Sequence, residues 1–174
     1  MLGAFRKPEH RAAREHWVGG SSRRIDVLIL RDPYNLFASR LAAGVSVLTP
    51  QLAARVWCQH ARQFLGRRRY LEQPICINYN RWASSAAYRR SVSEHLGLDF
   101  DDRSAHHVPS CAGGSSFDGL AYDGAATGMR VFDRWRRYAH DPHYLSLFTG
   151  ETRTLAHAIY GQLAADAGGL ARAA

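Results

Sequence analysis

The sequence has few cysteines and no long apolar run, and each shortage argues against a class of protein. Its 174 residues include three cysteines that are far apart and form no C-x-x-C pair, which argues against a disulfide scaffold or a zinc ribbon. The longest aliphatic stretch, residues 27–30, is far shorter than the roughly 20 residues that span a bilayer. The N-terminal segment carries too many charges for a secretory leader. We therefore expect a cytoplasmic protein with no metal site and no membrane contact.

Lysine is almost absent, and the basic charge comes from arginine. The chain has 22 arginines against one lysine, Lys7, and its formal net charge is +8. The planar fork of arginine matches phosphate and sulfate oxygens better than an ammonium group does. An arginine-rich and lysine-poor composition is also typical of a GC-rich genome, so composition alone names no ligand. With 46% hydrophobic and 22% charged residues, the chain has the composition of one globular domain.

Two short apolar runs predict strands at residues 25–30 and 75–79. The first run hardly alternates, as expected of a parallel strand that is buried on both faces. Between them the apolar spacing is helical, first up to Gly44 and then from a Thr49 cap to Gly66. This order predicts an α/β fold in which a short parallel sheet is flanked by helices.

The second half of the chain is predicted to contain helices on either side of a long irregular segment. A helix capped by Ser84 or Ser85 and closed by Gly97 follows the second strand. Residues 99–128 are rich in glycine, serine and aspartate, and loops of this length in a compact domain are commonly lids or binding loops. Two more helices are expected, which carry Met129, Phe132 and Trp135 in the first and Leu155, Ile159 and Leu163 in the second.

The turn after the first strand carries side chains suited to an anion. In open α/β sheets, ligands bind beyond the carboxyl ends of the strands, where helix N-termini direct free N–H groups at anions. Arg31 lies at that end of the strand, and Ser39 lies about two turns into the next helix. A guanidinium and a hydroxyl together can hold one phosphate. The alternative is that Arg31 pairs with Asp32 or another carboxylate and that Ser39 lies on a helix surface.

Residues 27–40, with the sequence VLILRDPYNLFASR, resemble the 3′-phosphate-binding segment of the sulfotransferases that use 3′-phosphoadenosine 5′-phosphosulfate (PAPS). In that family the segment is an apolar strand, then Arg-(Asn/Asp)-Pro, then a serine eight residues after the arginine. The resemblance implies that Arg31 and Ser39 hold the 3′-phosphate of the nucleotide. It also implies that this chain forms part of a three-layer sulfotransferase-like fold.

Two segments that resemble the family's helix and strand near the substrates follow in the same order. The tetrapeptide WCQH is similar to the family's W-x-x-H helix, which implies that Trp57 and His60 contact the acceptor. Tyr79 stands where the family has a tyrosine against the adenine, which implies a cofactor-binding role. The sequence departs from the family here, because Asn78 and Asn80 flank Tyr79 and the acidic residues usual after this tyrosine are missing.

A glycine-rich segment stands in the place of the family's loop over the 3′-phosphate. Residues 113–119, GGSSFDG, occupy this place, although the basic residue that many relatives carry there is missing. The resemblance implies that Gly114, Ser115 and Ser116 contact the nucleotide. Residues 129–135 resemble the helix that follows this loop in the family.

No segment of the sequence resembles the family's 5′-phosphosulfate loop. Residues 18–23 are the only glycine- and serine-rich run before the first strand, and no G-x-x-x-x-G-K-[ST] motif occurs. We therefore expect one N-terminally incomplete domain over residues 1–163 and a frayed tail over residues 164–174, with weak sulfotransferase activity or none from this chain alone. The family's base lies about twenty residues before the arginine, where His10 stands here, and an imidazole suits proton acceptance.

Two functions from different classes remain open. The first is a sulfotransferase domain that transfers a sulfuryl group from PAPS, without a metal, to a hydroxyl or amine of a small-molecule or carbohydrate acceptor. The second is a basic nucleic-acid or polyanion-binding module, which would bind any duplex with steep salt dependence. The patch of this module would comprise Arg67, Arg68, Arg69, Arg81, Arg89 and Arg90. A P-loop kinase is disfavoured by the missing motif. Self-association is also open, because an uncovered sheet edge at residues 25–30 would expose an apolar strand.

Overall fold

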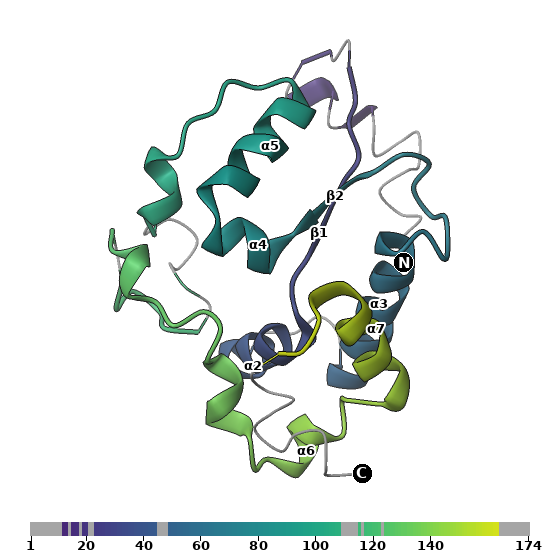
Figure 1. Cartoon of the computed structure of the whole chain (residues 1–174), viewed down its shortest axis with the longest axis vertical. Coiled ribbons are helices and arrows are strands. Elements are labelled where there is room, and N and C mark those ends of the chain that lie inside the picture. The colour runs from purple at the N-terminus through teal and green to yellow at the C-terminus, as the bar shows by residue number, and fades with distance from the viewer. Residues whose placement is uncertain are drawn as a thin grey trace.

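The structure is a computed structural model of the chain (Figure 1). It describes residues 12–13, 15–17, 19–20, 23–44, 49–108, 115, 117–122 and 124–163. The sheet consists of two parallel strands, β1 (Val27–Leu30) and β2 (Ile75–Asn78). Their register places Val27 opposite Ile75 and Leu30 opposite Asn78. The predicted α/β class and short parallel sheet are confirmed.

Helices flank this sheet on both sides. Figure 1 shows α4 and α5 on one side of the strands and α3 and α7 on the other, with α2 at the carboxyl end of β1. The α-helices are α2 (Pro33–Ala43), α3 (Pro50–Phe64), α4 (Tyr79–Ser84), α5 (Ala86–Leu96), α6 (Pro142–Leu145) and α7 (Gly150–Tyr160). Short 3₁₀ turns are η2 (Arg103–His106), η4 (Ala126–Gly128) and η5 (Arg134–Tyr138). None of the helices in the described part of the chain has the length and apolarity needed to cross a membrane.

Local capping accounts for the helix boundaries that the sequence predicted. The Thr49 hydroxyl accepts from the backbone N–H of Leu52 at 3.3 Å, and Pro50 occupies the first turn of α3. At the end of α2, Gly44 adopts a left-handed conformation with φ of +61°, which suits glycine at this position. The predicted cap and stop of these two helices are thus confirmed, except that α3 ends at Phe64 and Gly66 lies in the following turn.

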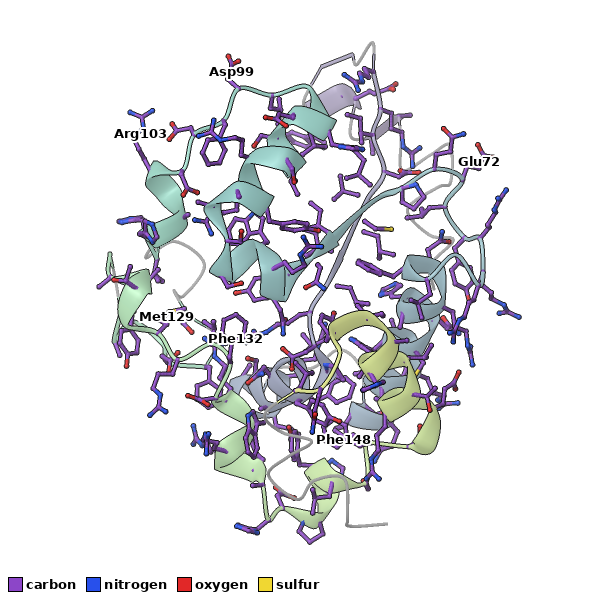
Figure 2. The ribbon with its side chains drawn as sticks, viewed as in Figure 1. Glu72, Asp99, Arg103, Met129, Phe132 and Phe148 are labelled. Carbon is purple, nitrogen blue, oxygen red and sulfur yellow. The ribbon has the colours of Figure 1, made fainter. Side chains whose placement is uncertain are left out.

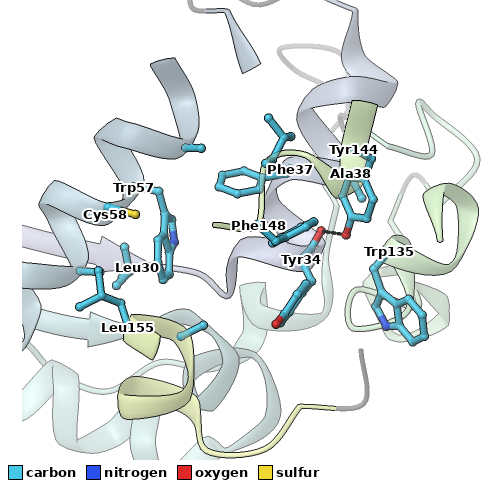
Figure 3. Close-up of a cluster of buried hydrophobic side chains, with 14 residues drawn as sticks. Leu30, Tyr34, Phe37, Ala38, Trp57, Cys58, Trp135, Tyr144, Phe148 and Leu155 are labelled. Atoms are coloured by element: carbon cyan, nitrogen blue, oxygen red, sulfur yellow. Dashed lines mark hydrogen bonds between the residues drawn. The ribbon is translucent and has the colours of Figure 1, made fainter. Parts of the chain in front are cut away.

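The hydrophobic core lies between α2, α3 and the C-terminal helices (Figure 3). Tyr34 stacks on Phe148 with ring centroids 4.7 Å apart, and its carbonyl accepts from the Tyr144 hydroxyl at 2.9 Å. Trp57 is buried in the same cluster, and its indole N–H donates to the carbonyl of Arg31 at 2.9 Å. The core therefore fixes the position of the backbone at the carboxyl end of β1.

The prediction that the first strand is buried on both faces is wrong. Leu28 and Leu30 are buried, whereas Val27 and Ile29 are exposed. The helices α3 and α7 cover the face that carries Leu30, and within the described residues β2 is the sole strand paired with β1. The side chains of Val27 and Ile29 therefore leave the other face of β1 apolar and exposed, and within the described residues the second edge of β1 is paired with no strand.

The prediction of a helix with an apolar stripe from Met129 is also wrong. The chain instead turns and forms the 3₁₀ segment η5, and of the three predicted apolar positions only Trp135 is buried. Figure 2 shows Met129 and Phe132 in the segment that leads to η5. The physical reason is tertiary, because the backbone N–H groups of Arg134 and Trp135 donate to the side chain of Asn35 at 2.9 and 3.4 Å.

One-sided burial of β1 gives a direct stability test. Leu30→Ala is expected to lower the free energy of unfolding by about 2–5 kcal/mol, because it removes a buried side chain and leaves a cavity. Ile29→Ala is the matched control, since Ile29 is 60% exposed and its truncation should cost less than about 1 kcal/mol. Equilibrium unfolding in urea measures both losses. Equal losses would contradict the orientation of the strand.

Candidate functional site

Two arginines from distant parts of the chain meet at the carboxyl end of β1. Arg31 directly follows the strand, and Arg134 begins η5. Both guanidiniums reach the hydroxyl of Ser39 in α2, with Arg134 Nη1 at 2.7 Å and Arg31 Nη1 at 3.5 Å. Arg134 is only 6% exposed. Such a concentration of buried positive charge favours an anion, because each guanidinium has lost part of its hydration.

A chain of buried side chains positions Arg134. The carboxylate of Asp32 accepts from both the backbone N–H and the side-chain NH₂ of Asn35, at 2.9 and 3.0 Å. Because the NH₂ of Asn35 is held in this way, its amide oxygen faces the other direction and accepts from the backbone N–H of Arg134. The cap of α2 therefore also fixes the start of η5. Arg31 pairs with no carboxylate of the described residues, and Ser39 is buried, so within this part of the chain the alternative that the sequence left open is not realised.

Ser115 and Gly119 form a backbone bridge, and the described residues of this turn close one side of the arginine cluster. The hydroxyl of Ser115 accepts from Arg134 Nη2 at 2.9 Å, and the carboxylate of Asp118 accepts from the same nitrogen at 3.1 Å. The ring of Phe117 lies 5.0 Å from the Arg134 guanidinium, which is a cation–π distance. Arg134 thus contacts a hydroxyl, a carboxylate and an aromatic face of this one turn.

In the arginine cluster, two guanidinium groups lie close together and one carboxylate contacts them. Burial lowers the pKa of Arg134, the charge of Arg31 lowers it further, and the Asp118 carboxylate raises it. Arg31 donates through Nη2 to the carbonyl of Val131 at 2.6 Å. Among the described residues, its buried Nε has no hydrogen-bond partner. The cluster therefore contains a buried N–H donor, Arg31 Nε, that no described residue accepts from. It also contains two guanidinium groups but only one described carboxylate in direct contact with them.

Tyr79 lies beside this cluster, at the start of α4. The Arg31 guanidinium lies 5.0 Å from the centroid of the Tyr79 ring, and Trp82 stacks near the same ring with centroids 6.1 Å apart. The structure thus brings together four of the residues that the sequence singled out, namely Arg31, Ser39, Tyr79 and Ser115. Three others, His10, Gly114 and Ser116, lie outside the described residues, as does the predicted tail at 164–174.

A cavity of about 340 Å³ adjoins the other side of Arg31. Trp57 and His60, the two predicted acceptor contacts, both line it. Burial lowers the pKa of His60, because it disfavours the protonated imidazole. The remaining lining residues are Ile29, Leu30, Leu36, Arg40, Ala53 and Val56. Since Arg31 lines the cavity and also belongs to the cluster, a ligand on Arg31 would lie next to a molecule in this cavity.

Sequence reasoning missed Arg134, Asn35 and Asp118. Arg134 stands in a segment that resembles the family helix after the glycine loop, but no local pattern separates it from the neighbouring arginines. Asn35 follows an Asp-Pro turn, and its spacing of three residues from Asp32 is a capping signal rather than a ligand signal. Within the described ranges, no three side chains of His, Cys, Asp or Glu cluster as metal ligands do.

Comparisons of this chain with protein-family models, with curated proteins and with solved structures find no match. Function is therefore inferred from the geometry of the arginine cluster and the adjoining cavity.

The burial of His60 predicts a pH effect. Its folded-state pKa lies below the ordinary value of 6.5, so its contribution to stability is present above pH 6.5 and is lost as the pH falls toward the folded-state pKa. His60→Gln should therefore reduce the loss of stability between about pH 7 and about pH 5 in urea unfolding. His157→Gln, at an exposed position in α7, controls for the removal of a histidine. An NMR titration of the His60 ring with a midpoint at or above 6.5 would contradict the prediction.

Proposed function

We propose that this chain is a PAPS-dependent sulfotransferase-family domain and that the arginine cluster binds the 3′-phosphate of the nucleotide. One observation carries the proposal: Arg31 and Arg134 converge on the hydroxyl of Ser39 at the carboxyl end of β1. This arrangement supports the role that the resemblance of residues 27–40 implies for Arg31 and Ser39. Ser115 lends further support, because it contacts the same Arg134 from the glycine-rich segment.

The donors of the cluster suit a phosphate monoester. Such a group carries close to two negative charges near neutral pH and presents three oxygens. Guanidinium groups bind phosphate through N–H donors, and Arg31 has two that are weakly used: its Nε has no partner among the described residues, and its Nη1 reaches Ser39 only at 3.5 Å. Two arginines can therefore neutralise the two charges, while the Ser39 hydroxyl supplies a further donor.

The adjoining groups suit the rest of the proposed reaction. The Tyr79 ring beside Arg31 offers an aromatic face to an adenine, and the cavity that Trp57 and His60 line offers a place for the acceptor. Bound PAPS would supply the sulfuryl group, which passes to a hydroxyl or amine of a small-molecule or carbohydrate acceptor. His10 remains the proposed proton acceptor. In the described residues, no glycine-rich loop follows either strand to receive a second phosphate.

The arginines that a nucleic-acid module would need do not share one free face. Arg89 is buried and bonds to both carboxylate oxygens of Asp102, at 2.5 and 2.8 Å. Figure 2 shows Glu72, which follows the Arg67–Arg69 turn, on a different side of the molecule from Asp99, which follows α5. This arrangement favours a compact phosphate site over an extended duplex surface.

Isothermal titration with adenosine 3′,5′-bisphosphate tests the proposal. Arg31→Ala is expected to weaken binding by about ten- to a hundredfold, because it removes charged hydrogen bonds worth about 1.5–3 kcal/mol. Arg136→Ala is the matched control, since Arg136 is exposed on η5 and pairs with Asp133 outside the cluster. Adenosine 5′-monophosphate, which lacks the 3′-phosphate, should bind the wild type more weakly than the bisphosphate does.

The same titrations can contradict the proposal in two ways. Equal affinity of the wild type and of a folded Arg31→Ala variant for the bisphosphate would remove Arg31 from the site. Equal affinity of the wild type for the two nucleotides would remove the 3′-phosphate as the recognised group. Duplex DNA binding with a steep dependence on salt, together with no preference for the bisphosphate, would favour the nucleic-acid module.

A further inference from the structure

We propose that the Asp118 carboxylate competes with anions for Arg134, so that an oxyanion binds Arg134 by displacing it. This inference deepens the proposed function and rests on it for the identity of the nucleotide. The competition itself concerns any oxyanion that reaches Arg134.

The carboxylate of Asp118 lies between the buried guanidinium and solvent. Its Oδ2 lies 3.1 Å from Arg134 Nη2, and the two side chains are 22% and 6% exposed, respectively. Asp118 can therefore leave toward water, whereas Arg134 is held by Ser39 and Ser115. An incoming oxyanion would take the place of the carboxylate on Nη2, since both are oxygen acceptors of the same nitrogen.

The turn that carries Asp118 can remain closed while its side chain moves. Ser115 and Gly119 exchange two backbone hydrogen bonds, of 2.9 and 2.8 Å, and Gly119 has a φ of +60°. The Ser115 hydroxyl also accepts from the backbone N–H groups of Phe117 and Asp118 at 3.3 and 3.2 Å. The Asp118 Oδ2 also accepts from the Ser115 hydroxyl at 3.1 Å. A rotation of the Asp118 side chain that breaks this bond and the contact with Arg134 uncovers Nη2, while the backbone bonds still hold the turn.

The displacement removes one contact and leaves the other charges of the cluster in place. Within the described residues, Asp118 is the carboxylate that contacts the two arginines, through Arg134. The fully buried Asp32 carboxylate bonds to Asn35 and remains a fixed negative charge beside Arg31. Every anion that reaches Arg134 Nη2 must therefore replace the same carboxylate, so removal of the Asp118 charge should tighten the binding of each of them.

Asp118→Asn tests the competition because it removes the charge and keeps the size of the side chain. We expect it to tighten the binding of inorganic phosphate and of adenosine 3′,5′-bisphosphate by about tenfold in isothermal titration. Asp133→Asn is the matched control, since it changes the net charge equally and its carboxylate pairs with Arg130 and Arg136 outside the cluster. Thermal unfolding checks that both variants are folded.

A measurement on the wild type makes the test independent of the stability of the variant. Phosphate should shift the NMR signals of the Asp118 carboxylate carbon and of the Arg134 guanidinium together, with one midpoint. Phosphate binding with no change at Asp118 would overturn the proposal. Equal or weaker phosphate binding by Asp118→Asn would also overturn it, as would equal tightening by both variants, which would indicate a general charge effect.

The two proposals fail in different ways. If neither the wild type nor Asp118→Asn prefers the bisphosphate to adenosine 5′-monophosphate, the proposed nucleotide function is wrong, and the phosphate titrations still decide the competition. If the bisphosphate is preferred but Asp118→Asn binds phosphate no more tightly than the wild type, the competition is wrong and the nucleotide function stands.

Discussion

The hydrogen bonds that the Asn35 side chain accepts join the two halves of the chain and position its candidate site. Asn35 stands in the first turn of α2, and its amide oxygen holds the backbone N–H groups of Arg134 and Trp135. Trp135 then fills the core, while Arg134 reaches Ser39 on the same helix. These N–H groups are buried, so without Asn35 they would lack a partner at a cost of about 1–3 kcal/mol. The side-chain amide of Asn35 thus positions both a core residue, Trp135, and a site residue, Arg134.

The cluster around Arg134 is costly for stability, and the surrounding residues offset part of that cost. Two hydroxyls, one carboxylate and the face of Phe117 contact the buried guanidinium, yet its neighbour Arg31 keeps a buried donor without a partner. A purely structural cluster of this kind gains little over apolar packing. An anion that accepted from these donors would offset the cost of burying the two guanidinium groups. A bound ligand therefore explains the cluster better than a gain in stability does.

Local signals account for what the sequence could predict. The caps at Thr49, Gly44 and Gly97 involve residues close together in the chain, so the boundaries of α2, α3 and α5 follow from spacing and from the backbone freedom of glycine. The pairing of Arg31 with Ser39 was also local, since one strand, one turn and one helix place them. Arg134 could not be found in this way, because its position depends on Asn35, about a hundred residues earlier.

The parallel pairing of β1 with β2 has a consequence for the rate of folding. Val27 meets Ile75, so α2, α3 and the turn after them lie in the loop that this pairing closes. Contacts between residues so far apart in the chain form slowly, because the entropy of loop closure is lost before the contact stabilises the structure. Arg134 joins the carboxyl end of β1 from still further along the chain. An anion that binds this cluster only in the folded chain would stabilise the native state, and the gain would grow with its concentration.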